Sequence, residues 1–197
     1  MFFETTYDPD NKSLLCQLVE YTSKYHPYVI ESAEKYNLNP WVIAGLGSRE
    51  SHWGLALKPK GPGGTGDHAP RKGKMPPDGL GWGRGIMQID YFSHPFARGD
   101  EWMDPQKNIM YGSKVLANSM RTIKGRCTLK DGSIVIPGYD SDRLICYGLA
   151  AYNAGPLAVL TAIRRGVDVD LVTTGDNYSA DVLSRAGWFQ RALLVES

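Results

Sequence analysis

Apolar residues recur at helical spacing through the first quarter of the chain. The segments 14–25, 26–38 and 39–51 each carry apolar side chains three or four positions apart, which predicts amphipathic helices. Asn39 is placed to cap the third helix, and Pro40 to occupy its first position, where a missing N–H costs nothing. The chain is therefore predicted to open with helices.

The same spacing predicts four more helices in the second half of the chain. The first of them begins at Asp104 and Pro105, a pair typical of helix starts, and Ser141 is expected to cap the second. The four helices cover the segments 104–125, 142–155, 156–166 and 178–196.

The helical pattern breaks over residues 58–85, which are dense in glycine and proline and have no period. This stretch predicts a long loop with neither helix nor regular strand, and loops of such length commonly border binding sites. Residues 86–90 predict one short strand, and residues 128–136 predict a small hairpin around an Asp-Gly pair. We therefore expect one α+β domain over residues 1–197, mostly α, with a small sheet beside the loop.

Composition and charge narrow the possible partners. The 197 residues are 42% hydrophobic and carry 22 basic and 21 acidic side chains, for a net charge of +1. No basic run is dense enough for a nucleic-acid partner, and no segment reaches the roughly 18 apolar residues of a membrane span. The first ten residues lack a secretory signal, so we expect synthesis in the cytoplasm.

The chain has three cysteines, Cys16, Cys127 and Cys146, which we expect to be reduced, with Cys146 in the core. The alternative is a disulfide bridge between Cys127 and Cys146.

One acidic residue interrupts an apolar stripe of the third helix. Ile43, Leu46 and Glu50 lie at positions i, i+3 and i+7, so Glu50 faces the core near the end of that helix. Burial raises the pKa of a carboxyl group, and an acid with a raised pKa can donate a proton near neutral pH. The plainer interpretation is an ion pair with Arg49 or a backbone cap.

Two further motifs resemble parts of a sugar-binding site. Residues 81–90, GWGRGIMQID, place Asp90 after a glycine-rich turn, and residues 150–155, AAYNAG, place Tyr152 and Asn153 at a helix end. Glycine lets a polymer approach the backbone, and aromatic rings offer flat faces to sugars. Taken alone, Asp90 is more typical of a turn and AAYNAG of a helix that ends at a glycine. A metal site is not expected, because the histidines show no ligand spacing.

Together, five motifs resemble those of the goose-type lysozymes, which belong with the soluble lytic transglycosylases to one lysozyme-like superfamily. The resemblance covers about residues 29–190 and leaves residues 1–28 as an extra N-terminal helical segment. It implies a lysozyme-like domain that hydrolyses the β-1,4 bond between N-acetylmuramic acid and N-acetylglucosamine. The motifs are SRESHWG at 48–54, GRGIMQID at 83–90, SH at 93–94, AAYNAG at 150–155 and YSADVLSRA at 178–186.

The resemblance also implies the roles of individual residues. Glu50 matches the general acid of the family, and Asp90 matches an aspartate that lines the cleft and positions water. It implies peptidoglycan glycan strands as the partner of a monomeric enzyme, with no metal and no cofactor. The residues that it places along the substrate are Ser51, Gln88, His94, Tyr152, Asn153 and Tyr178.

The chain departs from the family pattern in the loop before GRGIMQID, where a second acid is usual. An ungapped alignment puts Gly79 there, while Asp78 is one position away and Asp67 is a weaker candidate. An inverting hydrolase needs a second carboxylate to hold water across the sugar from the acid. Two acids near the motif, Asp78 and Asp90, favour the hydrolase.

Two alternatives stay open at this stage. A lytic transglycosylase would close the 6-hydroxyl of muramic acid onto C1 and leave 1,6-anhydro ends. A lysozyme-like module of a phage or wall assembly would bind glycan without cutting it, but it would have no use for a buried acid. Without a leader, the protein is expected to reach the wall as a phage endolysin does, through a holin-type pore, or as an effector that another, non-Sec secretion route delivers. A secreted enzyme expressed without its leader would have the same sequence features.

Overall fold

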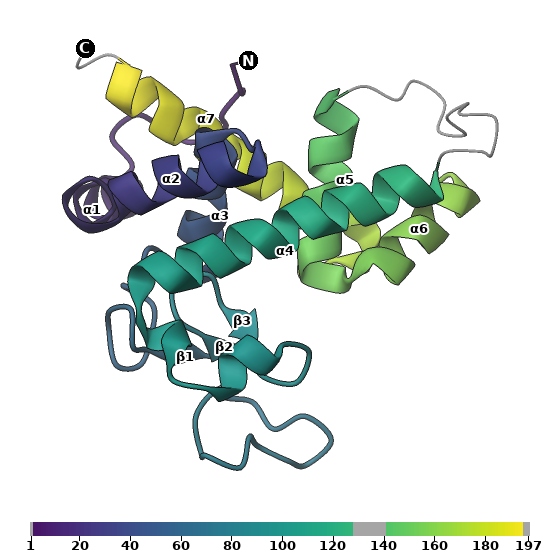
Figure 1. Ribbon diagram of the computed structural model, residues 1–197. Coiled ribbons are helices and arrows are strands. Elements are labelled where there is room, and N and C mark those ends of the chain that lie inside the picture. The colour runs from purple at the N-terminus through teal and green to yellow at the C-terminus, as the bar shows by residue number, and fades with distance from the viewer. Residues whose placement is uncertain (1, 128–140, 195–197) are drawn as a thin grey trace.

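The computed structural model describes residues 2–127 and 141–194, and helices dominate it (Figure 1). The α-helices are α1 Lys12–Glu20, α2 His26–Tyr36, α3 Pro40–Ser51, α4 Pro105–Arg126, α5 Ser141–Ala154, α6 Pro156–Arg165 and α7 Tyr178–Leu194. In Figure 1, α4 runs through the middle of the molecule, with a small sheet below it and with α5 and α6 towards its C-terminal end. The predicted α+β fold, mostly α, is confirmed.

The helices begin where their capping residues predict. The side chain of Asn39 accepts a hydrogen bond from the N–H of Trp41 (2.9 Å) at the start of α3, and Asp104 accepts one from the N–H of Lys107 (3.1 Å) at the start of α4. A π-helical turn, Tyr21–Tyr25, joins α1 directly to α2. Three short 3-10 turns complete the described helical structure, at Pro95–Arg98, Glu101–Met103 and Val169–Val172.

The sheet corrects the prediction for the glycine-rich stretch. β1 (Thr65–Gly66) and β2 (Gly83–Arg84) both lie within residues 58–85, which the sequence pattern predicts to hold no strand. They pair antiparallel with each other, and β2 pairs antiparallel with β3 (Ile89–Asp90) in the order β1-β2-β3. Strands of two residues are too short to show a period, and residues 86–88 form a turn instead of extending β3.

Aromatic side chains anchor the end of α3 against the N-terminal helices. Trp53, fully buried just after α3, stacks on Tyr25 with ring centroids 5.4 Å apart and tilts against Tyr21 at 5.0 Å. Phe189 of α7 meets Tyr21 edge-on at 5.4 Å. This cluster holds the last turn of α3 in place, and that turn carries Glu50.

The cysteines differ in burial from the prediction. Cys127 is the buried thiol and Cys146 is only half-buried, so the expectation that Cys146 is a core residue is wrong. None of the three forms a disulfide. The predicted hairpin at 128–136 and the side chain of Ser141 lie outside the described residues. Among the helices that the structure describes, none combines the length and the apolar character that a membrane span requires.

Candidate active site

A cavity of about 990 Å³ lies between the sheet, α4 and the end of α5. Its wall is built from segments far apart in the sequence, since it includes residues from α3, β3, α4 and the turn between α5 and α6. Six residues predicted from the sequence line it: Glu50, Gln88, Asp90, His94, Tyr152 and Asn153.

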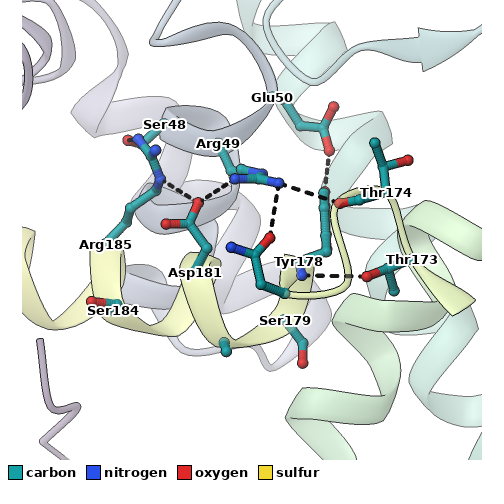
Figure 2. Close-up of polar contacts among 12 residues, drawn as sticks. Ser48, Arg49, Glu50, Thr173, Thr174, Tyr178, Ser179, Asp181, Ser184 and Arg185 are labelled. Carbon is teal, nitrogen blue, oxygen red and sulfur yellow. Dashed lines mark hydrogen bonds and ion pairs between the residues drawn. The ribbon is translucent and has the colours of Figure 1, made fainter. Parts of the chain in front are cut away.

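Glu50 lies in the last turn of α3, where its carboxyl group meets the start of α7 (Figure 2). The hydroxyl of Tyr178 donates a hydrogen bond to Oε1 of Glu50, which leaves Oε2 to carry a proton. Tyr178 is itself only 2% exposed and is not part of the cavity wall, so the structure places it behind the acid and not along the substrate.

The surroundings of Glu50 favour its protonated form. Burial raises its pKa from 4.5 to about 7, against the opposing effects of the Tyr178 hydrogen bond and the charge of Arg49. The raised pKa expected from its place on the apolar stripe is confirmed. A carboxyl group with this pKa holds its proton in mildly acidic solution and can transfer it to a leaving oxygen.

Arg49 is tied to α7 and does not pair with Glu50. Its Nη1 donates to Oδ2 of Asp181 (2.8 Å), and its Nη2 donates to the main-chain oxygen of Thr174 (3.4 Å), as Figure 2 shows. Asp181 also accepts a hydrogen bond from Nε of Arg185 (2.8 Å). The ion-pair partner of Arg49 therefore lies on another helix, and the alternative that Glu50 pairs with Arg49 is wrong.

Asp90, at the end of β3, is held as an anion beside the cavity. Its Oδ1 accepts hydrogen bonds from the N–H (2.8 Å) and the hydroxyl (2.7 Å) of Ser93, and its Oδ2 accepts one from Nη1 of Arg71 (2.5 Å). Partial burial raises the pKa of Asp90, but these donors outweigh burial and hold the pKa below its usual value. Asp67, just after β1, lines the same cavity and binds the same arginine.

Asp78 is not among the residues that line the cavity. Both of its carboxylate oxygens lie 2.9 Å from Nη2 of Arg84, a side chain with no exposed surface. The guanidinium of Arg84 also lies over the rings of Tyr91 (4.9 Å) and Trp102 (5.4 Å). The structure therefore gives Asp78 the role of counterion to a buried arginine. Asp67, the weaker candidate in the sequence, takes the place by the cavity that was expected for Asp78.

Ser51 is another predicted contact that the structure places elsewhere. Its side chain is 1% exposed, and its Oγ accepts a hydrogen bond from the N–H of Gly54 (3.0 Å) in the turn after α3. Ser51 therefore stabilises the turn that follows the acid and is not part of the cavity wall.

The remaining predicted residues are fixed by polar contacts. Tyr152 donates to a main-chain carbonyl of the turn before β3 (2.7 Å), and the side-chain oxygen of Asn153 accepts from a main-chain N–H ahead of α7 (2.9 Å). Nδ1 of His94 lies 3.3 Å from the hydroxyl of Tyr111. Gln88 donates to a main-chain carbonyl of its own turn (2.7 Å). These contacts restrict the side chains to fixed positions along the cavity wall.

Sequence reasoning missed one wall of the cavity. Tyr111, Lys114, Asn118 and Thr122 line it from one face of α4. Their spacing of i, i+3, i+7 and i+11 is a second helical stripe, made of polar and aromatic residues opposite the buried face. This stripe is the feature of the sequence that could have predicted the α4 wall of the cavity. Arg71 was missed as well, because nothing local shows where a loop residue points.

Comparison with known proteins agrees with this geometry. The sequence pattern of the family described as Lysozyme g matches residues 16–192. Lysozyme g of Struthio camelus is 30% identical over 168 residues, which are 85% of this chain and 67% of that protein. Lysozyme g of Casuarius casuarius is 30% identical over 169 residues (85% and 74%), and that of Takifugu rubripes is 30% identical over 170 residues (84% and 74%). The chain therefore belongs to the goose-type lysozymes, a family of peptidoglycan-degrading glycoside hydrolases.

Proposed function

We propose that this protein hydrolyses the β-1,4 bond between N-acetylmuramic acid and N-acetylglucosamine with inversion at the anomeric carbon. One observation carries the proposal: the carboxyl group of Glu50, with its pKa raised to about 7, forms part of the wall of a cavity of about 990 Å³. A protein that only binds glycan has no use for a buried acid, which costs folding free energy whenever it ionises.

In the first half of the reaction, Glu50 acts as the general acid. The proton on Oε2 moves to the glycosidic oxygen while the bond from C1 to that oxygen breaks, and positive charge develops on the sugar ring. Tyr178 stays hydrogen-bonded to Oε1 and keeps the carboxyl group turned towards the cavity. The ionised Glu50 that results is then stabilised by this donor and by the charge of Arg49.

In the second half, a water molecule attacks C1 from the opposite face of the sugar. Its oxygen forms the new bond to C1, and its proton passes to an aspartate of the pair Asp67 and Asp90. Opposite shifts support this division of labour, because the pKa of Glu50 is raised and that of Asp90 is lowered. Mildly acidic solution therefore keeps Glu50 protonated while Asp90 is an anion.

We also propose that a monomer carries out the reaction on a single glycan strand. This chain by itself brings Glu50, Asp67 and Asp90 to one cavity, as a monomeric enzyme requires. The polar stripe on α4 extends the wall beyond the acid, which suits a substrate of several sugar rings.

The products of peptidoglycan digestion test this function. We expect mass spectrometry to find reducing N-acetylmuramic acid ends from the wild-type protein. Glu50→Gln keeps the shape and the hydrogen bond from Tyr178 but has no proton to give, so its rate should fall by at least about 10²-fold, the lower end of what proton transfer contributes.

Other products would identify a different reaction. If the wild type leaves 1,6-anhydro ends, the protein is a lytic transglycosylase and the water step is wrong. If it binds peptidoglycan without releasing any fragment, the glycan-binding module replaces the enzyme.

A further inference from the structure

Arg71 joins the two aspartates that line the cavity. Its Nε and Nη2 donate to Oδ2 of Asp67 (3.1 and 2.6 Å), and its Nη1 donates to Oδ2 of Asp90 (2.5 Å). The arginine comes from the loop between β1 and β2 and lines the cavity itself. A planar guanidinium that binds two carboxylates with separate N–H groups fixes their separation and their orientation.

Two contacts within the loop hold Arg71 in position, one with Trp82 and one with Lys74. Its guanidinium lies 4.8 Å from the centre of the Trp82 ring, and Trp82 is 7% exposed. The indole N–H of Trp82 in turn donates to the main-chain oxygen of Ala69 (3.1 Å). Backbone hydrogen bonds link Arg71 and Lys74 in both directions (2.9 and 3.1 Å), which closes the turn that carries the arginine.

The two aspartates differ in the oxygen atoms that remain available. Both oxygens of Asp90 are occupied, Oδ1 by Ser93 and Oδ2 by Arg71. Asp67 uses only Oδ2, and no donor in the described part of the chain reaches its Oδ1. Asp67 also has a left-handed backbone, with φ +50°, a conformation that is uncommon for residues other than glycine and that recurs at functional sites.

We propose that Arg71 is a positioning residue that ties Asp67 to the firmly held Asp90, so that Oδ1 of Asp67 receives the proton of the attacking water. Asp90 is held by Ser93, and Arg71, which binds both aspartates, holds Asp67 at a set distance from Asp90. This inference rests on the proposed hydrolysis, and it assigns the glycine-rich loop a direct part in the reaction.

The test compares Arg71→Gln and Arg71→Lys with the wild type in rate profiles across pH. In Arg71→Gln we expect kcat to fall about tenfold to a hundredfold, with KM within about twofold, because alignment is lost but substrate contacts are not. The decline of the rate on the acid side should begin at a higher pH, because the pair of Asp67 and Asp90 loses the cation that both carboxylates bind. The decline on the alkaline side follows Glu50 and should not move.

The kcat of Arg71→Lys should lie between those of the wild type and of Arg71→Gln, since a lysine keeps the charge but cannot bridge both carboxylates with fixed geometry. Lys74→Gln is the matched control: it removes one positive charge from the same loop, its side chain is exposed, and it bonds to neither carboxylate. It should leave kcat and both limbs of the profile as in the wild type. His94, the other titratable side chain that interacts with Asp90, has its pKa lowered by burial and is common to all variants.

Two results would overturn the inference. One is an Arg71→Gln protein with wild-type kcat and an unmoved acid limb. The other is an equal loss of kcat in Arg71→Gln and Arg71→Lys with an unmoved acid limb, which indicates a structural role only. Both are distinct from a failure of the proposed hydrolysis, because 1,6-anhydro products from the wild type would show that failure in the same samples.

Discussion

Two carboxyl groups that line this cavity have pKa values shifted in opposite directions, and the surroundings of each group cause its shift. Glu50 sits on an apolar helix face with one hydroxyl donor, so burial dominates and its pKa rises to about 7. Asp90 sits at a strand end with Ser93 and Arg71 as donors, so its pKa falls below the usual value. Glu50 can therefore hold its proton at a pH at which Asp90 is already an anion.

The raised pKa of Glu50 predicts how stability depends on pH. The folded state favours the proton, so Glu50 contributes stability below pH 4.5 that is lost as the pH rises through about 7. One pKa unit corresponds to about 1.4 kcal/mol. The wild type should therefore lose up to about 3 kcal/mol of its free energy of unfolding, relative to Glu50→Gln, as the pH rises from 4.5 to about 8.

Urea denaturation at the two pH values measures this difference. Glu34→Gln, which changes an exposed carboxylate on α2, should follow the wild type at both values and serves as the control. Equal pH dependence in Glu50→Gln and the wild type would show that Glu50 is not a buried acid in solution.

At the scale of secondary structure, the site depends on the close packing of α3 against α7. A Cβ on Gly45 would lie 2.3 Å from the main-chain oxygen of Val182 and 2.9 Å from the nitrogen of Ala186, so the two backbones touch there. The helices are also joined by the ion pair of Arg49 and Asp181. Since α3 carries the acid and α7 carries its hydrogen-bond donor, this interface sets their geometry.

Gly45→Ala is therefore expected to damage both stability and activity. The added methyl group meets backbone that cannot rotate away, so we expect a loss of about 1–3 kcal/mol in the free energy of unfolding. Displacement of α3 should also lower kcat below that of the wild type at temperatures where the protein is still folded. Thermal denaturation and a turbidity assay on peptidoglycan measure the two effects.

The control for this substitution is Gly125→Ala, at the end of α4. A Cβ there meets no atom of the described residues within 4 Å, so helix propensity alone predicts an unchanged or slightly more stable protein. If both alanine variants behave alike, the packing of α3 on α7 does not set the geometry of the site.

At the scale of the whole molecule, an N-terminal arm of residues 2–8 binds along α7. The N–H of Phe3 donates to Gln190 (3.1 Å), the N–H of Thr6 donates to Ser184 (2.8 Å), and the main-chain oxygen of Asp8 accepts from the indole of Trp188 (2.8 Å). The matched family pattern begins only at residue 16, so the arm is additional to it.

Gly187→Ala should displace this arm without harming α7. A Cβ on Gly187 would lie 2.6 Å from the main-chain oxygen of Phe3 and 2.7 Å from that of Glu4, while alanine favours the helix itself. We expect a lower melting temperature and faster proteolysis within residues 2–8. In a chain that lacks residues 2–8, the same substitution should not destabilise the protein, and a full loss of stability there would contradict the explanation.

The sequence by itself determined the helices, the place of Glu50 and the family. Helices and their caps follow from interactions within a few residues, so the period of apolar side chains and signals such as Asn39 and Asp104 were sufficient. Because Glu50 breaks an apolar stripe, its partial burial and its raised pKa followed from the same period.

Only the tertiary structure decided which loop acid reaches the cavity. Asp78 is the nearer match in sequence, but the loop turns it to the buried Arg84 and brings Asp67 to the cavity wall beside Asp90. A glycine-rich loop has no period that ties a position to a face, and its strands of two residues are set by their partners. The direction of each loop side chain, Arg71 included, is therefore fixed by contacts between distant residues, which no local pattern in the sequence records.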